Sequence, residues 1–97
     1  MKAHKKLNAD DIIVRPMKKE NLSEVLGIER ASFPSPWPER LFQKELQNPI
    51  SDLFVALAPN LTGDHVLGYI VCWCVAGEVH IQNIASHPHF RRIGIAS

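Results

Sequence analysis

The sequence has no long apolar run, little net charge and only two cysteines. Its longest apolar stretch, residues 66–76, is much shorter than the roughly 20 residues that a membrane-spanning helix needs. A formal net charge of +1 gives no reason to expect a nucleic-acid or membrane partner. We therefore expect a cytoplasmic protein, with the basic residues 1–10 forming a flexible tail.

Cys72 and Cys74 stand two residues apart in the apolar stretch. On a β-strand they would share a face, with their Cα atoms near the outer limit for a disulfide bond. We predict two buried thiols in a reducing compartment. Histidines such as His80, His87 and His89 could suggest zinc, but the spacing of histidines and cysteines matches no common zinc pattern. No metal site is predicted.

The apolar content of 45% in 97 residues is sufficient for one small packed domain, residues 1–97. Short β-branched runs predict strands, and apolar stripes at helical spacing predict two helices. The predicted helices are residues 21–33, with Asn21 as a cap, and 38–47, which begins at Pro38. The predicted strands are residues 11–17, 52–59, 65–76 and 78–86.

This β-α-α-β-β-β order predicts an α+β fold, in which an antiparallel sheet of sequential strands packs against both helices. The third strand is so apolar that both of its faces should be buried. Gly77 predicts a tight hairpin between the third and fourth strands.

The sequence ends in a basic turn after the fourth strand, with the letters R-R-I-G-I-A at residues 91–96. A glycine turn at a helix start presents consecutive backbone N–H groups, which suit a phosphate or pyrophosphate. Arg91 and Arg92 would add charge-assisted contacts. A helix cap without a ligand is the alternative interpretation of the same turn.

The spacing R-x-x-G-x-A after an apolar strand resembles the acyl-CoA-binding motif of the GNAT N-acetyltransferase superfamily. The preceding segment, E-V-H-I-Q-N-I-A-S-H-P, resembles the strand whose main chain holds the pantetheine arm and thioester in that superfamily. The resemblance implies the GNAT fold and acetyl-CoA as co-substrate. The implied cofactor-binding residues are Ile84, Ala85, Ser86, Arg91, Arg92, Ile93, Gly94, Ile95, Ala96 and Ser97.

The segment I-E-R-A-S-F-P-S-P-W-P-E-R-L-F-Q-K-E-L is similar to the helix-loop-helix of bacterial ribosomal-protein-alanine N-acetyltransferases, the RimI type. The resemblance implies acetylation of the N-terminal alanine of a ribosomal protein. It makes Phe33, Pro36 and Trp37 candidates for contacts with the acceptor peptide, although they could instead form a hydrophobic plug. Glu29 could bind the ammonium of the substrate, or it could lie at the rim of the buried helix stripe.

In RimI-type enzymes the proposed base is a glutamate on a fifth strand, and the proposed acid is a tyrosine on the next helix. Neither maps onto these 97 residues, so no catalytic residue is assigned. We therefore expect the N-terminal part of an acetyltransferase, cut inside its cofactor motif. Glu78, His80 and Gln82 alternate onto one face of the fourth strand, and Glu78 or His80 is the alternative base.

Two further functions stay open. One is a non-catalytic fragment that associates with another chain, or with itself, through the exposed edge of the fourth strand. The other is an acetyltransferase that acts on a small-molecule amine. The similarity of the helix-loop-helix to the RimI type favours a ribosomal protein as the acceptor.

Overall fold

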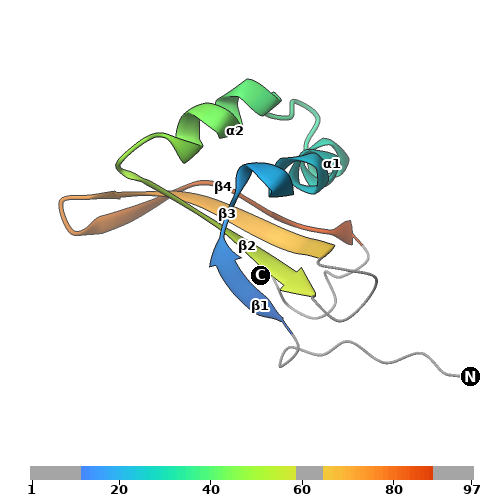
Figure 1. The fold of residues 1–97 in the computed structure, drawn as a ribbon. Coiled ribbons are helices and arrows are strands. Elements are labelled where there is room, and N and C mark those ends of the chain that lie inside the picture. Colours follow the sequence, from blue (N-terminus) through green and yellow to red (C-terminus); the bar gives the residue numbers. More distant parts are fainter. Residues whose placement is uncertain (1–11, 59–64, 89–97) are drawn as a thin grey trace, which may run out of the picture.

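The computed structural model describes residues 12–58 and 65–88 (Figure 1). Its elements follow the predicted order, with one additional short 3-10 helix before the first α-helix. They are β1 (Ile13–Pro16), η2 (Lys19–Asn21), α1 (Leu22–Ser32), α2 (Glu39–Leu46), β2 (Ser51–Ala58), β3 (His65–Val75) and β4 (Glu78–Ser86). The predicted N-terminal tail, residues 1–10, and the predicted acyl-CoA turn, residues 91–97, lie outside the described residues.

The four strands form one antiparallel sheet in the order β1-β2-β3-β4. Helices α1 and α2 lie on the same face of this sheet (Figure 1). The α+β class, the sequential antiparallel strands and the packing of both helices against the sheet are therefore confirmed. Within the described part of the chain, β4 is an edge strand, and this edge later forms one side of the candidate site.

The core lies between the helices and the sheet. Val25 of α1, Phe42 of α2 and Val71 of β3 have no exposed surface. The Phe42 ring contacts the Trp37 ring at a centroid distance of 5.1 Å, and it meets the Tyr69 ring edge-on at 5.9 Å. Aromatic contacts of this kind add to the hydrophobic stabilisation of a core. The loop between the helices is thus anchored to the core through Trp37.

The start of α1 differs from the prediction. Asn21 is the N-cap residue of α1 and also the last residue of the 3-10 helix, but its side chain makes no cap hydrogen bond to α1. Its Oδ1 instead accepts a hydrogen bond from the backbone N–H of Lys18, at 2.8 Å. Asn21 therefore occupies the predicted cap position of α1, but its side chain stabilises the turn before the helix rather than the helix itself.

The far end of β3 also differs from the prediction. Val66 to Cys72 are buried or nearly so, but Cys74 and Val75 are exposed. The hairpin of β3 and β4 extends past the part of the sheet that the helices cover (Figure 1). The predictions of two buried thiols and of a third strand buried throughout are therefore wrong at this end. Both cysteines are free thiols, as expected.

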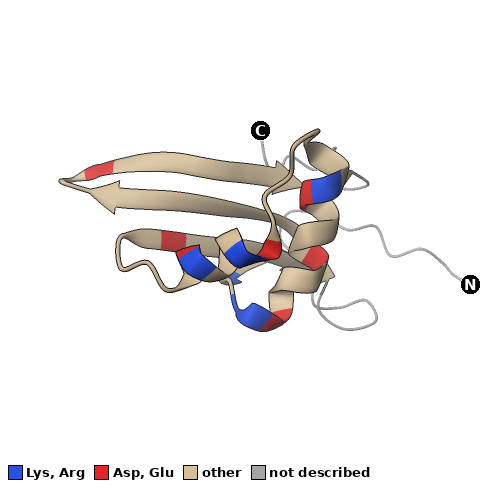
Figure 2. Ribbon diagram, turned by 90° about the horizontal axis from the view of Figure 1, so that it is seen from above, with Lys and Arg blue, Asp and Glu red and all other residues tan. Residues whose placement is uncertain are grey.

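Charged side chains concentrate on the helices and on the segments next to them (Figure 2). β3 contains no Lys, Arg, Asp or Glu, and β4 contains only Glu78. No helix in the described ranges has the length and apolar content required to cross a membrane. β3 and β4 together thus carry a single charged residue in the sheet.

A two-residue turn joins β3 to β4, as Gly77 predicted. Val75 pairs with Glu78, and both central residues have positive φ, 52° for Ala76 and 79° for Gly77. Two positive φ angles define a type I′ turn, which favours Asn-Gly. A non-glycine residue such as alanine is strained in this conformation.

Replacing Ala76 with asparagine is therefore expected to raise the free energy of unfolding by about 0.5–1 kcal/mol, because asparagine tolerates positive φ. Thermal unfolding followed by circular dichroism would show this as a higher melting temperature. Replacing Ala76 with valine should lower the melting temperature, because β-branched residues are poorly accommodated there. Equal melting temperatures for the two variants would contradict the assignment of the turn.

Candidate active site

A buried carboxylate joins the elements of the candidate site. Glu29 of α1 is only 1% exposed. Its Oε1 accepts hydrogen bonds from the Tyr69 hydroxyl at 2.5 Å and from Asn83 Nδ2 at 2.7 Å. Its Oε2 accepts a hydrogen bond from the Trp37 backbone N–H at 2.9 Å. This Glu29 network connects α1, the loop between the helices, β3 and β4.

Glu29 does not lie at the rim of the helix stripe, so that alternative is wrong. Both of its oxygens are already engaged by neutral donors, and no cation among the described residues pairs with it. A carboxylate without a cation is tolerated in a protein interior when several hydrogen-bond donors satisfy it. A contact between Glu29 and a substrate ammonium stays a prediction.

A bulge in β4 brings Asn83 into the network. Asn83 pairs with Val71 and Ile81 pairs with Cys72, so Gln82 is an extra residue without a partner position on β3. A bulge of this kind interrupts the strict alternation of side chains along a strand. As a result, the Asn83 side chain lies on the helix-covered face of the sheet, where it reaches Glu29.

The predicted acceptor loop lies directly beside this network. Phe33 and Trp37 are half-buried and pack against the core, whereas Pro36 is exposed. Phe33 and Trp37 therefore act as the hydrophobic plug that the sequence suggested as one alternative. The hydrogen bond from the Trp37 N–H to Glu29 Oε2 fixes the loop two residues before α2 begins. Contacts of Phe33, Pro36 and Trp37 with a peptide stay a prediction.

The predicted thioester-binding strand is the outer edge of β4. Ala85 and Ser86 are buried, and Ile84 is 38% exposed. The His87 N–H donates to the Leu67 carbonyl at 2.6 Å, so the backbone of His87 is directed toward β3. In an antiparallel strand the backbone N–H and C=O groups of every second residue point to the same neighbouring strand, so those of Ala85 also point to β3. Ile84 therefore directs its N–H and C=O toward the outer edge.

A hollow of about 380 Å³ lies where β4 ends against α1. It is lined by Glu24 and Ile28 of α1, by Val66 of β3, and by His87 and Pro88 after β4. Glu24 Oε2 accepts a hydrogen bond from the Val66 N–H at 3.1 Å, which fixes α1 against the start of β3. The predicted pyrophosphate-binding residues, Arg92 to Ser97, follow this point in the sequence but lie outside the described residues.

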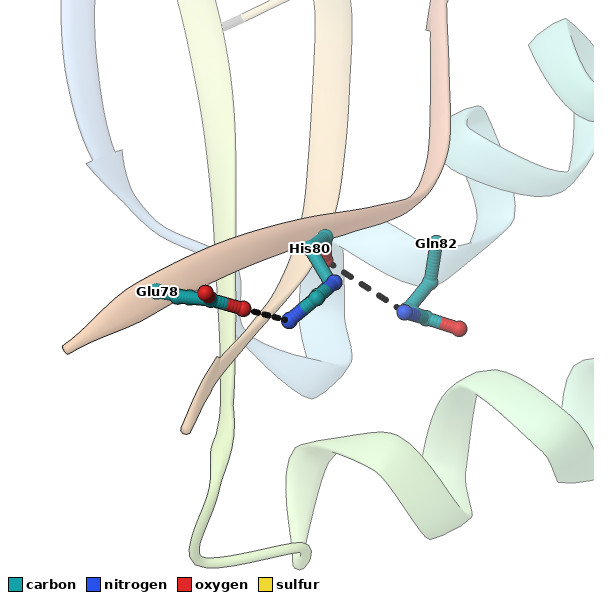
Figure 3. Close-up of polar contacts among 3 residues, drawn as sticks. All are labelled: Glu78, His80 and Gln82. Atoms are coloured by element: carbon teal, nitrogen blue, oxygen red, sulfur yellow. Dashed lines mark hydrogen bonds and ion pairs between the residues drawn. The ribbon is translucent and has the colours of Figure 1, made fainter. Parts of the chain in front are cut away.

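Glu78, His80 and Gln82 lie on the same side of β4, near the hairpin (Figure 3). Glu78 Oε1 and His80 Nε2 are 3.1 Å apart, and both side chains are more than half exposed. Gln82 Nε2 donates to the His80 carbonyl at 3.4 Å. The alternative base is thus a solvent-exposed Glu–His pair, and its role stays a prediction.

The cysteines lie on the face of the sheet opposite to Trp73. Cys74 Sγ donates to Asp52 Oδ2 at 3.0 Å, and this hydrogen bond raises the pKa of the Cys74 thiol to about 11. At neutral pH the thiol therefore stays protonated and is a weak nucleophile. In residues 12–58 and 65–88, no three His, Cys, Asp or Glu side chains meet in a metal-ligand arrangement.

Burial, followed by the hydrogen bond to Glu29, raises the pKa of Tyr69 well above its ordinary value. In the unfolded chain the phenol ionises near pH 10, whereas the folded chain keeps it protonated. The buried Tyr69 hydroxyl therefore contributes to the free energy of unfolding below about pH 10. As the pH rises further, this contribution falls by up to about 1.4 kcal/mol per pH unit.

The stability of a Cys74→Ser variant should therefore decline above about pH 10, and an added Tyr69→Phe substitution should flatten that decline. The serine background removes the thiol that titrates in the same range. Urea unfolding at several alkaline pH values would measure both slopes. Equal slopes with and without Tyr69 would contradict the role of its buried hydroxyl.

Two site residues, Tyr69 and Asn83, were not identified from the sequence. The apolar pattern of residues 65–76 predicts a strand and gives Tyr69 no separate role. Strict alternation along β4 predicts Asn83 on the face opposite to His80. The adjacent polar residues Gln82 and Asn83 were the one available signal, since two successive polar residues interrupt the alternation of a strand.

Comparisons with known proteins agree with this geometry. The acetyltransferase (GNAT) family profile matches residues 22–97. A Bacillus subtilis protein, provisionally named a [ribosomal protein bS18]-alanine N-acetyltransferase, is 37% identical over 79 residues, which cover 80% of this chain and 50% of that protein. The chain thus spans about half the length of the curated relative that it matches.

Two solved structures share the fold. The ribosomal-protein-S18-alanine N-acetyltransferase from Escherichia coli superimposes with a TM-score of 0.70 at 22% identity, covering 86% of this chain and 50% of that one. Arabidopsis thaliana NAA60, solved in complex with a bisubstrate analogue, gives a TM-score of 0.74 at 19% identity, covering 87% and 60%. With a family profile that matches most of its length, the chain belongs to the GNAT acetyltransferase family.

Proposed function

We propose that this chain is part of a cytoplasmic enzyme that transfers an acetyl group from acetyl-CoA to the N-terminal alanine amine of a ribosomal protein. The observation that carries the proposal is the 37% identity to the Bacillus subtilis relative over 79 residues. The geometry supports it, because the Glu29 network holds that loop beside the outer edge of β4.

The proposed reaction is direct attack of a neutral amine on the thioester carbonyl carbon. A C–N bond forms, the C–S bond breaks, and the leaving thiolate takes up a proton. The developing oxyanion needs a donor in a fixed position. The Ile84 N–H, which faces the outer edge of β4, is suited to this role. The remaining predicted acetyl-CoA contacts come from Ala85, Ser86 and the turn from Arg91 to Ser97.

The amine must lose a proton before it attacks, which requires a general base. By the family resemblance, the base and the acid come from segments that follow residue 97 in longer relatives. Glu78 and His80 form the alternative, but their exposed position gives neither of them the desolvated surroundings that commonly tune a catalytic base.

An acetylation assay on a chimera would test the function. The chain would be joined after Ser97 to the C-terminal half of the Bacillus subtilis relative, and incubated with acetyl-CoA and a bS18 peptide that begins with alanine. We expect acetylation of this peptide and none of the same peptide with a blocked N-terminus. Acetylation of small amines without peptide acetylation would favour the small-molecule alternative and contradict the proposal.

We also propose that the chain without bound acetyl-CoA associates with a second copy through the β4 edge. Val79 and Ile81 of this strand are 65% and 58% exposed, and an apolar edge strand readily recruits another strand. Sedimentation velocity should therefore show a dimer or larger species. Replacing Ile81 with lysine should give monomers, whereas the matched Val14→Lys change on β1 should not. Monomers at all concentrations for the unchanged protein would contradict this proposal.

A further inference from the structure

We infer that Asn83 binds the amine of the acceptor peptide through its Oδ1 atom, and that Glu29 fixes the orientation of the Asn83 amide. The inference deepens the proposed function and rests on it. It assigns a substrate-binding role to a residue that neither the cofactor motif nor the acceptor-loop resemblance includes.

The orientation of Asn83 follows from hydrogen-bond chemistry. Asn83 Nδ2 donates a hydrogen bond to Glu29 Oε1 at 2.7 Å, and this oxygen also accepts from the Tyr69 hydroxyl. The opposite assignment would place two acceptor oxygens against each other. The Oδ1 atom of Asn83 therefore points away from Glu29, as an acceptor in a fixed position.

This oxygen is available to a ligand. The bond to Glu29 is the only side-chain hydrogen bond of Asn83 within the described ranges. There, the only fully enclosed polar side-chain atom without a partner is the Ser51 hydroxyl oxygen, so Asn83 Oδ1 is not sealed inside the protein. A half-buried acceptor with a fixed direction and no protein partner is suited to an N–H donor from a ligand.

The location of Asn83 matches the position that the acceptor amine requires. It directly precedes Ile84, whose N–H faces the outer edge of β4. Through Glu29 it is also linked to Trp37, the last residue of the acceptor loop before Pro38 and α2. An amine held at Asn83 would thus lie between the predicted peptide-binding loop and the predicted thioester-binding edge.

An amide oxygen also suits the chemistry better than a carboxylate would. A carboxylate in direct contact favours the charged ammonium, which cannot attack a thioester. The neutral Asn83 oxygen accepts an N–H bond without that strong preference. The bond from Asn83 to the Glu29 carboxylate polarises the amide, and therefore strengthens Oδ1 as an acceptor. Glu29 in this arrangement is a positioning residue.

An NMR titration of the full 97-residue chain tests the inference. The probes are a short peptide that begins with alanine and the same peptide with an acetylated N-terminus. We expect the free-amine peptide to shift the side-chain NH₂ resonances of Asn83, and the acetylated peptide to leave them unchanged. This measurement on the unmodified protein does not depend on whether a variant folds.

Variants supply the second measurement. Replacing Asn83 with leucine should weaken binding of the free-amine peptide about tenfold, the effect of one lost hydrogen bond to a charged or polar amine. The matched control is Gln82→Leu on the adjacent bulge residue, whose side chain donates to the His80 carbonyl and is not among the described hydrogen-bond partners of Glu29, and which should leave the affinity unchanged. Together with the Asn83 resonance shifts, this difference would support the inference.

Two kinds of result would overturn the inference, and both can be told apart from a failure of the proposed function. If the free-amine peptide binds equally well to the Asn83→Leu variant and the unchanged protein, the inference is overturned while the proposed function stands. If the acetylated peptide binds as tightly as the free-amine peptide, or neither binds, Asn83 does not recognise an amine and the inference is also overturned. The chimera assay then decides separately on the proposed function.

Discussion

Replacing Glu29 with alanine is expected to lower the free energy of unfolding by about 3–5 kcal/mol. The substitution removes three hydrogen bonds and leaves the donors of Tyr69, Asn83 and Trp37 in a largely buried place. Each unsatisfied buried donor costs about 1–3 kcal/mol. Because a small domain has only about 5–15 kcal/mol of stability, the alanine variant should be close to unfolded at room temperature.

Urea unfolding followed by circular dichroism would measure this loss. Glu29→Gln should cost less, about 1–2 kcal/mol, because the amide keeps one acceptor oxygen and the Tyr69 hydroxyl can accept from its NH₂ group. Glu20→Ala, an exposed glutamate before α1, is the matched control and should change stability by less than about 0.5 kcal/mol. A Glu29→Ala variant within 1 kcal/mol of the unchanged protein would show that the network does not stabilise the fold.

The sequence predicted the elements of this fold well because its local signals agree with one another. Pro34 and Pro36 separate two helical stripes, and Gly77 stands between two apolar strands that pair through a two-residue turn. The turn conformation depends on residues adjacent in sequence, and so does the break between the helices. Local patterns were therefore sufficient to predict the antiparallel order.

The Glu29 network was not predictable in the same way. Glu29 lies 40 residues from Tyr69 and 54 residues from Asn83 in the sequence. A glutamate among apolar helix positions indicates only that hydrogen-bond donors must lie near its carboxylate. Which donors do so depends on the register of β3 against β4, and the bulge at Gln82 changes that register by one residue.

The same bulge explains why Asn83 was missed. Strict alternation predicts Glu78, His80 and Gln82 on one face, and Asn83 on the other. The extra residue in β4 moves Asn83 to the side of Glu29, whereas the residues before it keep their predicted side. Bulges frequently redirect a side chain next to a functional site. The position of the bulge therefore agrees with the amine-binding role inferred for Asn83.

The second large effect concerns catalysis. These 97 residues alone are expected to transfer no acetyl group above the uncatalysed rate. Glu29 and Tyr69 are buried beside the predicted acceptor and thioester sites, but the Tyr69 hydroxyl and both Glu29 oxygens are already engaged in hydrogen bonds. By the family resemblance, the acid and the base come from segments that follow residue 97 in longer relatives. A positioned acid or base contributes typically about 10²–10⁴-fold to the rate. The chain alone should therefore be at least about 10⁴-fold slower than the chimera that carries the C-terminal half of the relative.

Weak binding of acetyl-CoA should lower the rate further. In the 97-residue polypeptide of this assay, we expect the predicted phosphate site to bind weakly, because an isolated helical turn is not stable in water. Mass spectrometry of the bS18 peptide after incubation with acetyl-CoA would measure transfer, and calorimetry would measure acetyl-CoA binding. Turnover that Glu78→Gln or His80→Ala abolishes would overturn the prediction, because it would place the base on β4, in the exposed pair near the hairpin.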